Sequence, residues 1–186
     1  IKAYRANLPV LRQLEQKLKE FEKTKEEGCV LSPEQESELK DIKHRCRLIS
    51  NFKSSLPTLM YQATFSLSHS AKGNEGYWRK QSHCVLNGLF MLDIDHIKCA
   101  PKELFDKWVE DYVSLNKDVE SLDLPTQRRA WANSLGIMIV HITPSGEGLR
   151  IVAKADISGN IADNQENLSK KLGVEPDAAC KDASRC

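Results

Sequence analysis

Hydrophobic residues in the first fifty positions recur at helical spacing on a charged background. One such stripe ends at Gly28, and Ser32-Pro33-Glu34-Gln35 then combines an N-cap serine, a proline at the first helical position and a capping-box glutamine. The pattern predicts a hairpin of two antiparallel helices over residues 5–52. We interpret it as a packing element, with an interaction arm as the alternative. Its seam is expected at Leu11, Leu14, Leu18, Leu39, Ile42 and Ile49.

After residue 52 the pattern alternates between strand-like and helix-like segments. Strands are predicted at 58–67, 85–95, 136–142 and 149–155, helices at 101–115 and 164–172, and a loop at 68–76. We take the strand at 85–95 as the central one. Strands interleaved with helices indicate a mixed sheet with flanking helices, and we predict the α+β class. Residues 1–52 and 53–186 are therefore expected to form two domains.

The segment "GLFMLDIDHI", residues 88–97, places two aspartates in one of the most apolar stretches of the chain. Side chains alternate along a strand, so Asp93 and Asp95 are expected on one face. Two buried carboxylates repel each other and lose their hydration, and they need protons or cations to compensate. Divalent metals held by oxygen ligands are the usual solution. The alternative is that the strand ends at Asp93 and both aspartates are solvated.

Composition and charge describe an ordinary globular protein. The 186 residues are 40% hydrophobic and 28% charged, with a formal net charge of +1, which does not favour dependence on non-specific phosphate contacts. The six cysteines form no C-x-x-C pair, and we read them as reduced cytosolic thiols. A zinc site at Cys180 and Cys186, with His83 and Cys84, is a minor alternative. We expect a cytoplasmic protein without a membrane segment, and a fragment truncated at the C-terminus.

A glycine-containing turn joins the last two predicted strands in "HITPSGEGLRIV". Gly146 and Gly148 give the backbone freedom to turn its N–H groups toward an anion, and Ser145 adds a hydroxyl donor. Arg150 opens the next strand and offers a planar, bidentate grip on phosphate. We expect Arg150 to face a cleft and to contribute little to stability. The alternative is a hairpin whose glycines serve only the turn.

A third candidate carboxylate lies near the end of the sequence. "VEPDAACKDASR" carries Asp177 and Asp182, either of which offers a third carboxylate. The order of strand-D-x-D, strand-S-G-x-G-x-strand and late aspartate resembles the catalytic core of the archaeo-eukaryotic primase (primase-polymerase) superfamily. The segments "SGEGLRIVAK" and "D-x-x-C-K-D-x-S-R" are similar to its VirE N-terminal-like branch, which is related to CRISPR-associated primase-polymerases. The resemblance covers about residues 53–186 and leaves the helical hairpin unexplained.

The resemblance assigns roles residue by residue. Asp93 and Asp95 correspond to the first metal-binding motif and Asp177 to the third, with Asp182 as the alternative. Ser145, Gly146, Gly148 and Arg150 correspond to the nucleotide-binding motif. Arg150 stands where most members carry a histidine, so activity could be altered or lost. We expect the triphosphate to contact the amides near the two glycines, the Ser145 hydroxyl and the Arg150 guanidinium.

The resemblance implies a nucleotidyltransferase that makes or extends nucleic-acid strands from nucleoside triphosphates. It implies two Mg²⁺ or Mn²⁺ ions, a nucleic-acid template or primer, and a fused or adjacent helicase, in the replication of mobile elements or in CRISPR-linked DNA metabolism. Two alternatives remain. One is a nucleotide-binding or nucleic-acid-binding module of the same fold with weak or lost turnover. The other is a metal-dependent nuclease or phosphoesterase, although a nuclease needs no triphosphate cradle.

Overall fold

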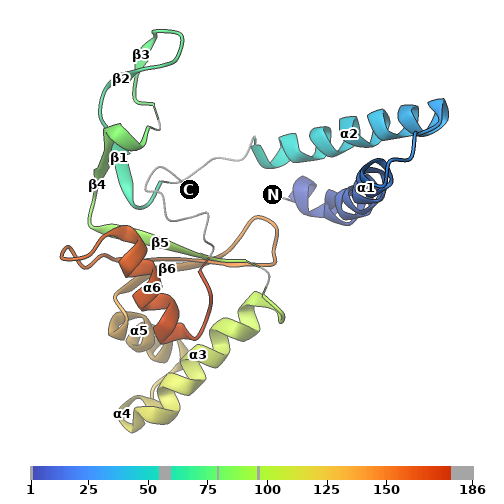
Figure 1. The fold of residues 1–186 in the computed structure, drawn as a ribbon. Coiled ribbons are helices and arrows are strands. Elements are labelled where there is room, and N and C mark those ends of the chain that lie inside the picture. Colours follow the sequence, from blue (N-terminus) through green and yellow to red (C-terminus); the bar gives the residue numbers. More distant parts are fainter. Residues whose placement is uncertain (1, 55–59, 79, 96, 177–186) are drawn as a thin grey trace. The chain divides into compact units, whose positions relative to one another are not determined.

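A computed structural model describes residues 2–54, 60–78, 80–95 and 97–176. The chain divides into two compact units, Ile1–Pro57 and Thr58–Cys186. The division lies close to the boundary that the hydrophobic pattern predicted at residue 52. Helices and small sheets both contribute, so the predicted α+β class is confirmed, and Figure 1 shows the elements of each unit.

The first unit is the predicted helical hairpin. Helix α1 spans Lys2–Glu26 and helix α2 spans Pro33–Ser54. The turn carries the expected capping box: the Ser32 amide donates to Gln35 Oε1 at 2.8 Å, and the Gln35 amide lies 3.3 Å from Ser32 Oγ. The predicted seam is confirmed, because Leu11, Leu14, Leu39, Ile42 and Ile49 are all buried and Leu18 packs against this cluster.

We expect deletion of residues 1–57 to leave the second unit folded. The described residues of the hydrophobic core of the second unit all lie between Phe90 and Val174, so this unit builds its core from its own residues. Trp108 and Trp131 lie in that core, and their fluorescence during urea unfolding measures its stability. A midpoint close to that of the full chain supports the prediction. Loss of the cooperative transition would show that the hairpin belongs to the same folding unit.

The second unit contains short strands, a three-stranded sheet and four helices among the described residues. Its strands are β1 (Ala63–Phe65), β2 (Ser68–His69), β3 (Glu75–Gly76), β4 (Cys84–Leu86), β5 (Leu89–Ile94), β6 (Ile137–Ile142) and β7 (Leu149–Lys154). Its helices are α3 (Pro101–Leu115), α4 (Lys117–Glu120), α5 (Leu124–Ser134) and α6 (Ile161–Leu172), with a 3₁₀ turn at Gln81–His83. No helix among the described residues is both long enough and apolar enough to cross a membrane.

The main sheet is antiparallel, with the order β5-β7-β6. Strand alternation sends Phe90, Leu92 and Ile94 of β5 to the same face as Leu149 and Ile151 of β7, and all five are buried. Figure 1 shows α3, α5 and α6 on one side of this sheet. Trp108 of α3 and Trp131 of α5 stack with ring centroids 6.1 Å apart. The core of the unit is therefore the layer between the sheet and the helices.

Three predictions about elements need correction. The expected strand 85–95 is broken at Gly88, whose φ is +81°, so β4 and β5 belong to different sheets. Strand β5 is an outer strand of the described sheet, and the central one is β7. The segment 68–76 is a small hairpin of β2 and β3, not only a loop.

Candidate functional site

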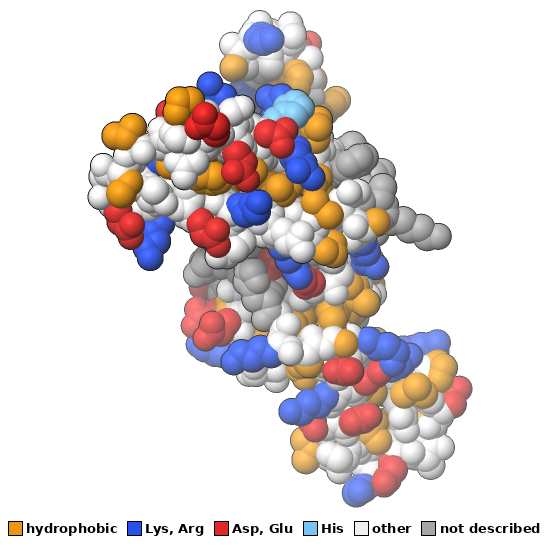
Figure 2. All heavy atoms as spheres, turned by 90° about the vertical axis from the view of Figure 1, so that its right-hand side faces the viewer, with side chains coloured by type: hydrophobic (Ala, Val, Ile, Leu, Met, Phe, Trp, Pro, Cys, Tyr) orange, Lys and Arg blue, Asp and Glu red, His pale blue; other side chains and the backbone are white. Residues whose placement is uncertain are grey.

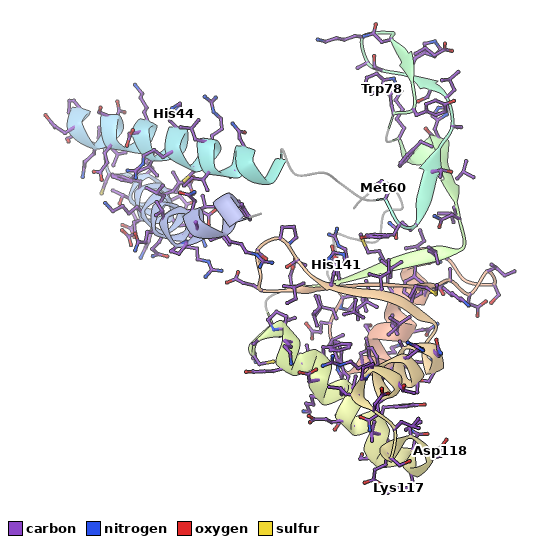
Figure 3. All side chains as sticks on the ribbon, turned by 180° about the vertical axis from the view of Figure 1, so that it is seen from behind. His44, Met60, Trp78, Lys117, Asp118 and His141 are labelled. Atoms are coloured by element: carbon purple, nitrogen blue, oxygen red, sulfur yellow. The ribbon has the colours of Figure 1, made fainter. Side chains whose placement is uncertain are left out.

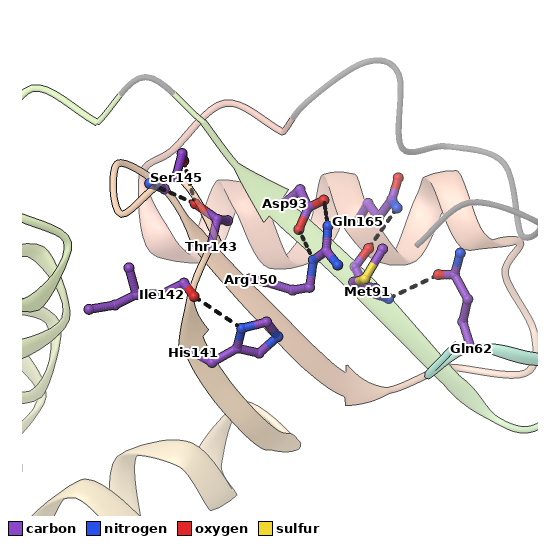
Figure 4. Close-up of polar contacts among 10 residues, drawn as sticks. Gln62, Met91, Asp93, His141, Ile142, Thr143, Ser145, Arg150 and Gln165 are labelled. Carbon is purple, nitrogen blue, oxygen red and sulfur yellow. Dashed lines mark hydrogen bonds and ion pairs between the residues drawn. The ribbon is translucent and has the colours of Figure 1, made fainter. Parts of the chain in front are cut away.

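Asp93 lies on β5 directly opposite Arg150 of β7. The two side chains form a bidentate ion pair, in which Arg150 Nε and one terminal nitrogen donate to the two Asp93 oxygens at 2.5 and 2.6 Å. Figure 4 shows this pair on the face of the sheet. The side chain of Asp93 is 7% exposed and that of Arg150 is 17% exposed. Arg150 therefore supplies the cation that the buried aspartate requires.

This ion pair changes the expectation for Arg150. We predicted that the arginine faces a cleft and adds little to stability, and the structure contradicts this prediction. Removing either partner leaves the other charge largely buried without its counter-ion, which costs about 3–5 kcal/mol. The ion pair therefore helps to fix the register between β5 and β7, in addition to the alternation of buried hydrophobic residues.

Asp95 is placed differently from Asp93. It follows the last residue of β5, and its side chain is exposed to solvent. The expectation that both carboxylates emerge from one buried strand therefore holds for Asp93 alone. The alternative of two solvated aspartates holds for Asp95 alone. The Asp93 carboxylate is thus neutralised by Arg150, whereas the Asp95 carboxylate is exposed to water.

The glycine turn lies against the end of β5. A Cβ atom added to Gly148 would lie 2.6 Å from the Ile94 carbonyl oxygen and 2.7 Å from Asp95 Oδ1. Only a residue without a side chain allows the two segments to come so close. The expectation that this turn lies beside the aspartates is confirmed.

The turn is stabilised by its own hydrogen bonds. The Gly146 amide donates to the Thr143 carbonyl at 2.9 Å, and the Gly148 amide donates to Thr143 Oγ1 at 3.1 Å. Ser145 Oγ lies 3.0 Å from Thr143 Oγ1. The two glycine amides therefore serve the hairpin in this conformation and are not directed at an open anion site, so their contact with a triphosphate stays a prediction.

A histidine that the sequence did not single out completes a row across the sheet. His141 of β6 lies opposite Arg150, so the row runs from Asp93 through Arg150 to His141. Its ring centroid lies 6.0 Å from that of Tyr61, and Nδ1 lies 3.3 Å from the Ile142 carbonyl oxygen. A carbonyl only accepts, so this contact requires the proton on Nδ1. His141 Nε2 is buried without a hydrogen-bond partner among the described residues.

Two buried glutamines close the outer edge of β5. The Met91 amide donates to Gln62 Oε1 at 3.1 Å, and Gln165 Nε2 of α6 donates to the Met91 carbonyl at 2.7 Å. The exposed fractions of these glutamines are 0% and 1%. Buried backbone groups need partners, and here side chains replace a further strand. The glutamines hold β5, and with it Asp93, in place (Figure 4).

A second ionic cluster lies in the helical layer. Arg128 of α5 donates to Asp106 of α3 at 2.8 Å, and its guanidinium lies 5.4 Å from the centre of the Phe105 ring. A hydrogen bond from Lys102 and a second from Arg128 lower the pKa of Asp106. Asp106 and Arg128 come from helices α3 and α5, which pack on each other. We therefore interpret it as structural.

The remaining predicted residues lie apart from these contacts. Asp177 and its alternative Asp182 lie outside the described residues, as do Cys180 and Cys186 of the minor zinc alternative. The described part of the chain contains no group of three or more His, Cys, Asp or Glu side chains placed to hold a metal ion. The cysteines of that part, Cys29, Cys46, Cys84 and Cys99, form no disulfide with one another.

The surface carries charges of both signs. On the face drawn in Figure 2, acidic and basic side chains alternate without a large region of one sign. This mixture agrees with the net charge of +1.

No protein-family model, curated protein or solved structure matches the chain.

We expect Gly148→Ala to destabilise the second unit by about 1–3 kcal/mol, because overpacking against fixed backbone forces the strand end or the turn to shift. Urea unfolding measures the change. Gly159→Ala is the matched control, because a Cβ there meets its nearest atom at 3.4 Å and its φ lies outside the left-handed region. Equal stability of the two variants would contradict the close approach of the turn to β5.

Proposed function

We propose that the second unit is a nucleotidyltransferase of the primase-polymerase type, which extends nucleic-acid strands from nucleoside triphosphates. One observation carries the proposal: the D-x-D segment and the S-G-x-G turn, about fifty residues apart in sequence, lie side by side on paired strands. Asp93 is opposite Arg150, and Gly148 adjoins Asp95. A metal-dependent transferase needs its acidic residues and its phosphate-binding residues in such proximity.

The nucleotide-binding side of the proposed site is built by β6, β7 and their turn. Ser145 is partly exposed, and its hydroxyl lies 3.0 Å from Thr143 Oγ1, which accepts a hydrogen bond from the Gly148 amide. Arg150 offers a guanidinium suited to phosphate, provided that it leaves Asp93. His141 stands beside Arg150 on β6, so an imidazole is present next to the position where the resembling family carries one. In this proposal both residues bind phosphate oxygens.

The acidic side suits a hard divalent cation in its donor chemistry. Carboxylate oxygens are preferred ligands of Mg²⁺ and Mn²⁺, and Asp93, Asp95 and Asp177 are the residues that would hold such ions. When bound, the metal would activate the attacking hydroxyl and stabilise the leaving pyrophosphate. Asp93 is paired with Arg150 in the structure, so the carboxylate must exchange an arginine for a metal. We therefore propose that Arg150 moves from Asp93 to the triphosphate when both ligands bind.

The same ion pair favours the second candidate, a nucleotide-binding or nucleic-acid-binding module without turnover. A bidentate arginine in a largely buried pair is a stable alternative to a metal. In such a module Asp93 and Arg150 would be a permanent structural pair, and Asp95 would be an ordinary surface residue.

Extension of a labelled primer on a template tests the proposal. The full chain is incubated with deoxynucleoside or ribonucleoside triphosphates in Mn²⁺, and the products are separated on a denaturing gel. Longer products that need both the triphosphate and the metal support the transferase. Binding of the triphosphate without longer products supports the inactive module. Shorter products that need metal but no triphosphate indicate the nuclease alternative and overturn the proposal.

A further inference from the structure

Residues 60–86 form an arm with little core of its own. It consists of two short ladders, β1 with β4 and β2 with β3, of three and two residue pairs. Isolated two-stranded ladders are marginally stable in water. Five large hydrophobic side chains of the arm are nevertheless at least 41% exposed: Leu67, Tyr77, Trp78, Val85 and Leu86. A surface of this kind indicates a binding partner.

Two of the five are adjacent aromatic residues, and the structure fixes the orientation of one. Trp78 Nε1 donates to the Asn74 carbonyl at 3.0 Å, and the indole lies against Gly76, where an added Cβ would be 3.2 Å from Nε1. Trp78 still exposes 41% of its surface, and Tyr77 exposes 74%. The β2–β3 hairpin thus holds the indole of Trp78 with an open surface (Figure 3), and the preceding residue in the chain, Tyr77, is also exposed.

The charge of the arm selects the kind of partner. Between Met60 and Asn87 the sequence holds one of the 26 acidic residues of the chain, Glu75, against three basic residues. Two of these, Lys72 and Lys80, are exposed, and the third, Arg79, lies outside the described residues. A surface with exposed rings and few acids suits a polyanion that also has flat apolar groups.

We propose that the arm binds single-stranded nucleic acid, with Tyr77 and Trp78 stacking on bases and Lys72 and Lys80 facing the backbone. Stacking on aromatic side chains and contacts from lysines are the common means of binding unpaired strands without sequence preference. The inference deepens the proposed function, since it names a surface for the template or primer. It stands on separate residues, however, so it can be tested without catalysis.

Fluorescence anisotropy of a labelled oligonucleotide of about 20 nucleotides, in EDTA and without triphosphate, measures the binding directly. Oligo-dT and oligo-U distinguish DNA from RNA. We expect affinity to fall by about sevenfold between 50 and 200 mM salt, as contacts of two lysines with the phosphates of a single strand require. Bound strands should quench the tryptophan fluorescence, because Trp78 is exposed while Trp108 and Trp131 are buried.

Substitutions within the arm separate stacking from general apolar contact. Tyr77→Ala and Trp78→Ala should each weaken binding by about tenfold, and Trp78→Phe should retain most of it because the ring face remains. Leu86→Ala is the matched control, since Leu86 is 57% exposed on the same arm but has no ring. Tyr77→Ala keeps the test valid if Trp78→Ala disturbs the hairpin, because Tyr77 is the more exposed of the two.

The inference is overturned by no binding by the wild-type chain, by equal binding by the wild-type and Tyr77→Ala proteins, or by an equal loss in Leu86→Ala. Sedimentation that shows a dimer dissociated by Leu86→Ala would assign the arm to a second copy of the chain and would also overturn it. Strand binding by a wild-type chain that does not extend a primer would support the arm while rejecting the proposed catalysis. The two proposals therefore fail separately.

Discussion

Asp93→Ala and Arg150→Ala are each expected to lower the free energy of unfolding of the second unit by about 3–5 kcal/mol. Each substitution leaves one charge in a site where the partner side chains are 7% and 17% exposed, so the remaining ion loses its counter-ion but regains little water. The double variant should cost much less than the sum of the two, because it leaves no unpaired charge. Urea unfolding of all four proteins, followed by the fluorescence of Trp108 and Trp131, gives the coupling energy.

Lys170→Ala is the matched control for this cycle. Lys170 pairs with Glu166 at 2.7 Å on the surface of α6, where both side chains are more than 60% exposed. Exposed pairs of this kind contribute about 0.3–0.5 kcal/mol. If Asp93→Ala costs no more than Lys170→Ala, the pair on the sheet is solvated, and its structural role is refuted. If Asp93→Ala does not fold, Asp93→Asn retains hydrogen-bond acceptance and measures the charge alone.

Asp95→Asn is expected to reduce nucleotide incorporation by at least about 100-fold, because a metal-held carboxylate provides several kcal/mol of transition-state stabilisation. The fold should be unaffected, since Asp95 follows β5 and is exposed. Primer extension measures the rate, and electron paramagnetic resonance of Mn²⁺ measures the affinity for the metal. Asp118→Asn is the control, because Asp118 is an exposed acidic residue of α4.

The two readouts of Asp95→Asn distinguish the candidate functions. Loss of both Mn²⁺ binding and incorporation supports the transferase. Unchanged Mn²⁺ affinity in Asp95→Asn would remove this residue from the proposed metal site. A wild-type chain that neither binds Mn²⁺ nor extends a primer leaves the binding module as the better description of this fold.

Much of the local structure could be predicted because its causes lie within a few residues. The hairpin α1–α2 follows from hydrophobic spacing and from the capping box at Ser32 and Gln35. Helix α3 follows from its hydrophobic stripe, and strands β6 and β7 follow from their short β-rich apolar runs. The signal for α6 was also present: Asn160 and Asp163 form a reciprocal cap, so the helix begins at Ile161, three residues before the predicted Asn164.

The elements that were missed carry weaker local signals. Trp131 is the buried residue of helix α5, so the helix has too few hydrophobic positions to show a recognisable stripe. Its local signals were the N-cap Asp123 and a proline, Pro125, in its first turn. The arm is built from strands of two or three residues, which are too short for alternation to be visible. Sequence periodicity needs several repeats before it can be recognised.

The chain sequence by itself determined the helical hairpin, the α+β class, the apolar strand around Asp93 and the glycine turn between the last two strands of the main sheet. Only the tertiary structure decided the partners of the polar groups. Asp93 meets Arg150 across 57 positions, and Met91 is held by Gln62 and Gln165 from segments 29 and 74 positions away. Periodicity and capping act between near neighbours, whereas the cation that neutralises a buried carboxylate is chosen by strand register. Register depends on the pairing of distant segments, which no local pattern contains.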